Sequence, residues 1–137
     1  MSTTPIADYA LLSDRHSAAL VSRDGSIDWL CFPRFDSPSI FGRLLGDQAG
    51  HWSLRATGAT QVTRRYLDRT MVLETTFRTP TGTVAITDAL ALGDGNRGHQ
   101  LGQDAPHLLL RRATCVEGDV DLERSFRGAP YAQIGAC

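Results

Sequence analysis

Lysine is absent from the sequence, so all fourteen basic residues are arginines, and fifteen acidic residues offset them. The formal net charge of -1 leaves no strongly basic surface of the kind that proteins use to bind a phosphate backbone. The composition therefore argues against nucleic acid as a partner.

Long apolar runs are also missing. No stretch approaches the roughly 20 apolar residues that a membrane-spanning helix requires. Residues 1–5 contain neither the basic segment nor the apolar run that is typical of a secretory leader. We therefore expect no membrane partner and a cytoplasmic location.

Sequence motifs typical of metal or cofactor binding are also scarce. The cysteines Cys31, Cys115 and Cys137 show no C-x-x-C spacing, and the four histidines form no H-x-H or H-x-x-x-H pair. Gly93 to Gly98 satisfy G-x-G-x-x-G, but no amphipathic helix follows to bind a pyrophosphate, so we interpret this stretch as a flexible loop. We expect no metal and no cofactor.

What the sequence does contain is a succession of short strand patterns. Its 137 residues suit one domain, and the turn residues Asp24 and Gly25 between two apolar runs predict a tight hairpin. Strands at intervals of about ten residues predict an all-β fold, an antiparallel β-sandwich. The predicted strands cover residues 9–12, 16–22, 27–32, 51–55, 61–67, 70–78, 83–92, 107–116 and 120–126.

One short helix is predicted near residues 38–45. Ser37 can cap its first turn and Pro38 suits the first helical position. The apolar residues expected on one face of this helix are Ile40, Phe41, Leu44 and Leu45.

The two tryptophans allow two interpretations. Exposed together they could form a platform that stacks on sugar rings, whereas alternation along their strands favours inward positions. Trp29 is expected to share an apolar face with Ile27 and Cys31, and to lie in the core or an interface. Trp52 is expected to point inward.

The loop at residues 33–38 is the most distinctive local feature. Two prolines stiffen a segment that carries Arg34, Phe35 and Asp36, and rigid loops with such side chains often form sites and interfaces. Alternatively, the two charged residues pair with each other or cap the predicted helix. The spacing alone leaves both interpretations open.

Catalytic residues are not predicted anywhere in the chain. Ser13, Asp14 and His16 have the residue types of a triad but lie in a turn without a nucleophile elbow. The chain is therefore interpreted as a non-catalytic domain. Three alternative interpretations are a free carbohydrate-binding module, an active enzyme with a pair of carboxylates, and a vestigial product without activity.

Three stretches near the start resemble a known family. Residues 6–14, 18–31 and 33–38 are similar to the beginning of bacterial members of glycoside hydrolase family fifteen, the glucoamylase-like and trehalase-like enzymes. The similarity continues through residue 123, with matching stretches at 65–67, 72–75, 82–88 and 110–118.

The resemblance implies a β-sandwich placed before an (α/α)-barrel that cleaves α-glucosidic bonds with inversion. In that family two barrel glutamates act as general acid and base. None of Glu74, Glu117 and Glu123 matches such a motif, so no catalytic role is transferred to this chain. The missing barrel is the expected partner in cis. An α-glucoside would be bound through that barrel, with Trp29, Arg34, Phe35 and Asp36 as candidates for its cleft or interface.

The sequence departs from the family after Glu123, where further strands and the barrel are expected. We therefore assign residues 1–126 to a truncated sandwich and residues 127–137 to an irregular tail. Faces that further strands would cover should then lie open. The candidates are the face of Leu108 and Leu110 and the face of Val120, Leu122 and Phe126.

Overall fold

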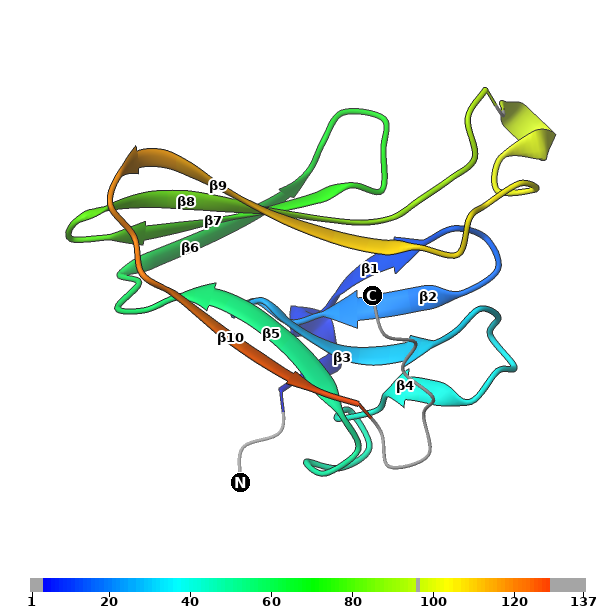
Figure 1. The fold of residues 1–137 in the computed structure, drawn as a ribbon, viewed down its shortest axis with the longest axis horizontal. Coiled ribbons are helices and arrows are strands. Elements are labelled where there is room, and N and C mark those ends of the chain that lie inside the picture. The colour runs from blue at the N-terminus through cyan, green and yellow to red at the C-terminus, as the bar shows by residue number, and fades with distance from the viewer. Residues whose placement is uncertain (1–3, 96, 129–137) are drawn as a thin grey trace.

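The strands form two antiparallel sheets in a computed structural model that describes residues 4–95 and 97–128 (Figure 1). The all-β sandwich predicted from the sequence is confirmed. The strands are β1 (Ala10–Ser13), β2 (Ala18–Val21), β3 (Ser26–Cys31), β4 (Ser39–Phe41), β5 (His51–Ala56), β6 (Gln61–Tyr66), β7 (Leu73–Thr79), β8 (Gly82–Leu90), β9 (Leu109–Gly118) and β10 (Leu122–Arg127), with the 3-10 turns η1 (Ile6–Asp8) and η2 (Gly98–Gln100).

The first sheet has six strands in the order β1-β2-β3-β5-β10, with β4 also paired to β3. The second sheet has four strands in the order β6-β7-β8-β9. The last strand, β10, therefore does not follow β9 in its sheet but returns to the first sheet beside β5. The two layers lie one above the other in Figure 1.

The predicted hairpin joins β2 to β3. Gly25 has a φ of 85°, and a Cβ at this position would collide with the carbonyl oxygen of Leu54. Both the left-handed backbone and the close approach of β5 therefore require glycine here. This agreement explains why the Asp-Gly pair was informative in the sequence.

The predicted helix near residues 38–45 is wrong. Residues 39–41 instead form β4, in which Phe41 pairs with Leu30 of β3, and two tight turns follow at Gly42 and Arg43. Phe41 is buried in the core, whereas Leu45 is 79% exposed, so the expected apolar helical face does not exist. A two-turn helix is marginal on its own, and pairing with β3 while burying a phenylalanine is the better alternative.

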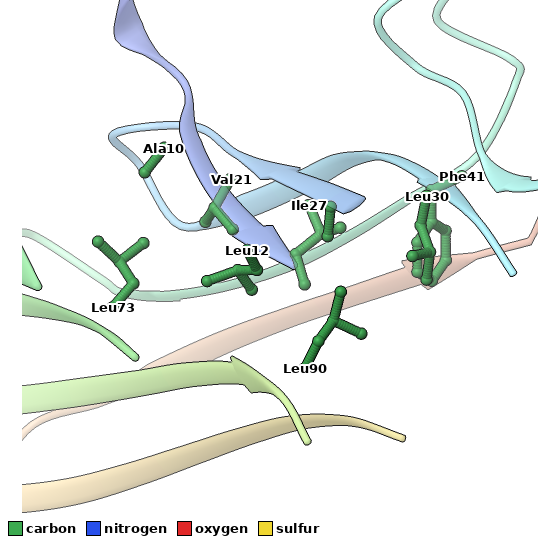
Figure 2. Close-up of a cluster of buried hydrophobic side chains, with 9 residues drawn as sticks. Ala10, Leu12, Val21, Ile27, Leu30, Phe41, Leu73 and Leu90 are labelled. Carbon is green, nitrogen blue, oxygen red and sulfur yellow. The ribbon is translucent and has the colours of Figure 1, made fainter. Parts of the chain in front are cut away.

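The core lies between the two sheets in two clusters. The larger cluster combines first-sheet residues with Leu73 and Leu90 of the second sheet, which face Leu12 and Ile27 (Figure 2). The smaller cluster consists of Ala56, Phe77, Val84 and Ile86.

The far end of the chain lies partly outside the described residues. Arg127 still belongs to β10, and of the predicted irregular tail only residues 127 and 128 are described. Over residues 4–95 and 97–128, no helix has the length and apolar character needed to cross a bilayer.

Candidate functional site

The loop at residues 33–38 projects from the end of β3 and is held by its own hydrogen bonds. The Arg34 amide donates to Ser37 Oγ at 3.0 Å, and the Ser37 amide donates to the Arg34 carbonyl at 3.1 Å. Arg34 Nε and Asp36 Oδ1 form an ion pair at 3.2 Å, with both side chains largely exposed. The structure thus shows the charge pair expected under the second interpretation, but no helix for it to cap.

Phe35 is presented to solvent by this loop. Its side chain is 62% exposed, while its backbone amide donates to the carbonyl of His16 at 2.8 Å. The loop is therefore anchored to the β1–β2 turn and still leaves its aromatic ring uncovered. Together the loop and the turn line a shallow depression of about 390 Å³, formed by Arg15, His16, Arg34, Phe35 and Asp36.

The β1–β2 turn beneath the depression is organised by Asp14, which is fully buried. Its Oδ1 accepts the backbone amides of His16 at 2.9 Å and Ser17 at 2.8 Å. Its Oδ2 has no hydrogen bond and lies 3.8 Å from Nδ1 of His107. The rings of His16 and His107 are in edge contact, with centroids 5.4 Å apart. The sequence did not reveal this approach, because His107 is remote along the chain.

The contacts of the histidines do not indicate a metal centre. His16 Nε2 lies against the carbonyl of Gly102, to which it can only donate. His51 lies on β5 and faces Ser125 of β10. Over the described part of the chain, no three histidine, cysteine or carboxylate side chains gather in a metal-binding arrangement.

Trp29 does not occupy the position that simple alternation predicts. A bulge in β3 pairs Val21 with Ile27 but Leu20 with Trp29, which leaves Asp28 as the extra residue. Ile27 and Leu30 consequently both enter the core, and Trp29 points to the outer face, where it is half-buried. The prediction that Trp29 shares a face with Ile27 is therefore wrong.

Asp28, at the bulge, is buried and accepts hydrogen bonds from Tyr9 Oη at 2.7 Å and Ser26 Oγ at 2.5 Å. Burial of the Tyr9 phenol, together with its hydrogen bond to Asp28 and the negative charge there, raises the pKa of Tyr9 to about 12. The bulge thus interrupts the regular apolar alternation of β3 at Asp28. The buried Asp28 side chain is instead hydrogen-bonded to Tyr9 near the start of the chain.

Trp52 points inward as predicted and packs against the larger core cluster. Its ring is in edge contact with Phe126 at 5.7 Å, and the Arg111 guanidinium lies 5.4 Å from its centroid. Trp29 and Trp52 therefore lie on opposite faces of the first sheet and do not form one stacking platform.

Arg111 forms a buried clamp between the sheets that the sequence did not indicate. Its Nε donates to Asp88 Oδ1 at 2.7 Å, and neither side chain is exposed. Its terminal nitrogens donate to the carbonyls of Trp52 and Gly25, each at 2.7 Å. Burial raises the pKa of Asp88 above its usual value, and the adjacent guanidinium opposes that effect. These contacts connect β8 and β9 to the opposite sheet.

The three glutamates lie apart from one another. Glu74 pairs with Arg65 at 3.0 Å, Glu123 pairs with Arg55 at 3.4 Å, and Glu117 lies near the end of β9. A groove of about 820 Å³ has one carboxylate among its lining residues, Asp68, which is almost fully exposed. None of these glutamates shares that groove with Asp68.

Comparison with known proteins gives one family. The family model described as "Trehalase-like, N-terminal" matches residues 1–101. The trehalase of Mycobacterium tuberculosis is 43% identical over 143 aligned residues, which cover 96% of this chain and 21% of that relative. The trehalase of Mycolicibacterium smegmatis is 44% identical over the same shares of the two chains.

Two further relatives match a shorter part of the chain. Trehalase 1 of Sulfolobus acidocaldarius is 47% identical over 79 residues, which cover 57% of this chain and 14% of that relative. The chain thus spans about a fifth of the length of the mycobacterial relatives that it matches. No solved structure matches it.

Proposed function

Because the chain belongs to the trehalase-like N-terminal family, we propose that it serves as the non-catalytic amino-terminal domain of a glycoside hydrolase that cleaves α-glucosidic bonds. The proposed parent is a family-fifteen enzyme of the trehalase or glucoamylase type. In this proposal the general acid and general base belong to a catalytic barrel in the remaining four-fifths of the enzyme. The sandwich packs against that barrel and shapes one side of the substrate cleft.

The observation that carries this proposal is the loop of Arg34, Phe35 and Asp36. An aromatic ring that stays exposed on an anchored loop loses little conformational entropy when a partner covers it. The adjacent ion pair offers donors and acceptors that suit either a protein surface or the hydroxyl groups of a sugar.

The carbohydrate-binding alternative finds less support. A sugar platform needs exposed aromatic faces in one plane, whereas Trp52 packs against the core and Trp29 lies on the other face of the same sheet. Phe35 by itself offers one ring beside the depression. We therefore favour a role that depends on a neighbouring domain.

The proposal is tested in a chimera in which this chain replaces the matched region of the Mycobacterium tuberculosis relative. The isolated chain should release no glucose from trehalose or maltodextrins above background. The chimera should hydrolyse trehalose, and Phe35→Ala or Arg34→Ala in it should lower kcat/KM by about tenfold, as expected for an interface anchor.

The matched control is Leu45→Ala, which removes an exposed apolar side chain outside the loop. It should leave kcat/KM unchanged. Equal activity of the loop variants and the unmodified chimera would contradict the role of the loop in the cleft or interface. Glucose release by the purified isolated chain, abolished by substitution of one of its glutamates, would contradict the non-catalytic assignment.

A further inference from the structure

Three connecting segments lie at one end of the sandwich (Figure 1). They are the β1–β2 turn, the loop at residues 33–38, and the segment of residues 98–107 that precedes β9. The turn contacts the loop through the His16 carbonyl, which accepts the Phe35 amide. It also contacts the 98–107 segment through Arg15, so the turn connects that segment to the anchor of the Phe35 loop.

The 98–107 segment packs closely on the turn. The Arg15 guanidinium donates to the carbonyls of Gly98 at 3.4 Å and Leu101 at 3.1 Å. Gly102 has a φ of 85°, and a Cβ there would collide with the carbonyl oxygen of Asp14. The carbonyl of the same glycine accepts from His16 Nε2. Arginine stays charged and an imidazole can donate in either protonation state, so these contacts persist across neutral pH.

The contact between Asp14 and His107 is the one that depends on protonation. Asp14 is fully buried, and its Oδ1 is occupied by two backbone amides of the turn. Its Oδ2 has no hydrogen bond and lies 3.8 Å from His107 Nδ1. The His107 side chain is 41% exposed, so it can exchange a proton with solvent while it faces a buried carboxylate.

The backbone on both sides of this contact is in an unusual conformation. Arg15 on the turn and His107 at the end of the 98–107 segment have φ values of 73° and 52°. Residues other than glycine seldom adopt such values unless the surrounding structure holds them there. Both conformations therefore depend on the contacts between the two segments.

Two aromatic rings border the His107 imidazole. The ring centroid of His16 is 5.4 Å away and that of Phe32 is 6.3 Å away, both in edge contact. Two protonated imidazoles would repel each other at this distance. We therefore assign the titrating proton to His107, because this ring faces the carboxylate.

The charged side chains of the neighbouring depression are already engaged. Arg34 pairs with Asp36 at 3.2 Å, and the Arg15 guanidinium is directed to backbone carbonyls. Asp14 is therefore the carboxylate that a protonated His107 meets across this contact.

We propose that Asp14 and His107 form a pH-sensitive switch that fastens the 98–107 segment to the β1–β2 turn. When His107 is protonated, its Nδ1–H closes on Asp14 Oδ2 and supplies the donor that this oxygen lacks. When His107 is neutral, the charge attraction is lost and Oδ2 stays buried without a partner. Opening of the segment, which lets water reach Oδ2, then costs less free energy.

The segment is consequently held more firmly at acidic than at alkaline pH, and so is the turn that anchors Phe35. This switch goes beyond the proposed function, because it lies within the chain itself and requires no second domain.

Amide hydrogen exchange of the full chain tests the switch. Rates at about pH 5.5 and about pH 8 are converted to protection factors, which removes the intrinsic effect of pH on exchange. The amides of Leu101, Gln103 and Ala105 are hydrogen-bonded within the segment. They should be protected at least about threefold better at the acidic pH, as expected for a half-exposed ion pair. The amides of β8 report unfolding of the whole domain and should not show this gain.

Two variants remove the switch in different ways. His107→Gln removes the titrating group and should abolish the gain at acidic pH. Asp14→Asn keeps an oxygen for the two turn amides but removes the charge, and it should have the same effect. The matched control is His99→Gln, on an exposed histidine of the same segment, and it should retain the full gain. If Asp14→Asn does not fold, the comparison of His107→Gln with His99→Gln decides the test.

Equal protection of the segment at both pH values in the unmodified chain would overturn the inference. A gain that persists in His107→Gln would also overturn it, because another group would then be responsible. A gain lost to the same extent in His99→Gln would assign the effect to the overall charge of the segment and contradict the specific pair. None of these readouts depends on hydrolysis, so the switch and the proposed function can fail separately.

Discussion

At the scale of single residues, the most consequential side chain is Arg111. Its guanidinium contacts Asp88, the Trp52 carbonyl and the Gly25 carbonyl in the interior, where water cannot replace a lost partner. Buried ion pairs are costly to form, but removing one partner leaves an uncompensated charge. The clamp therefore makes the alignment of the two sheets dependent on one residue.

Arg111→Met should destabilise the domain by about 3–5 kcal/mol, because Asp88 then remains buried without a partner. The double variant Arg111→Met with Asp88→Leu should lose less stability than Arg111→Met alone, since both charges are gone. Urea denaturation followed by tryptophan fluorescence measures both. A loss below about 1 kcal/mol in Arg111→Met would show that water or a rearranged backbone satisfies Asp88.

At the scale of elements, β10 is an edge strand of the first sheet and pairs with β5 over residues 122–127. One of its side-chain contacts is between His51 Nε2 of β5 and Ser125 Oγ at 3.0 Å. Burial lowers the pKa of His51, and the nearby Arg43 lowers it further, while Asp28 acts in the opposite direction. The neutral imidazole is therefore the form that suits the folded strand pair.

This pKa shift predicts acid sensitivity. The unfolded chain binds a proton at His51 more readily than the folded chain, so stability falls as pH drops from the ordinary histidine pKa of 6.5 towards the lower folded value. The urea midpoint should thus decrease between pH 7.5 and pH 5, and His51→Gln should reduce that decrease. The same pH dependence in the variant would assign the effect to other groups.

At the scale of the whole molecule, the sandwich leaves several large apolar side chains exposed on β10 and at the start of β9. Leu108, Leu110, Leu122 and Phe126 are exposed, as the sequence predicted for strands that lack their neighbours, whereas Val120 is half-buried against the smaller core cluster. Exposed large apolar side chains of this kind favour association with other molecules.

The purified chain should therefore bind a hydrophobic dye in its native state, or self-associate in sedimentation. Leu122→Asn should reduce dye binding without loss of the cooperative melt, because Leu122 is already 41% exposed. Arg78→Asn, on an exposed side chain of β7, is the control and should leave dye binding unchanged. A compact monomer without dye binding would contradict this expectation.

Local chemistry was enough to predict most of the strands. The Asp-Gly turn before β3 and the alternation of Leu73, Thr75 and Phe77 on β7 are set by backbone preferences and by the period of a pleated strand. The exposed loop around Phe35 could also be anticipated, because its two prolines and its charges argue against burial. Its role towards a barrel stays a proposal.

The remaining features were decided by contacts between distant segments. The bulge at Asp28 turns Trp29 outward, and β4 replaces a helix because Phe41 finds a partner strand and a core. The Arg111 clamp and the approach of His107 to Asp14 join residues far apart in the sequence. Such outcomes depend on which strands become neighbours and what space lies between them. That balance of burial and pairing is settled only in the tertiary structure.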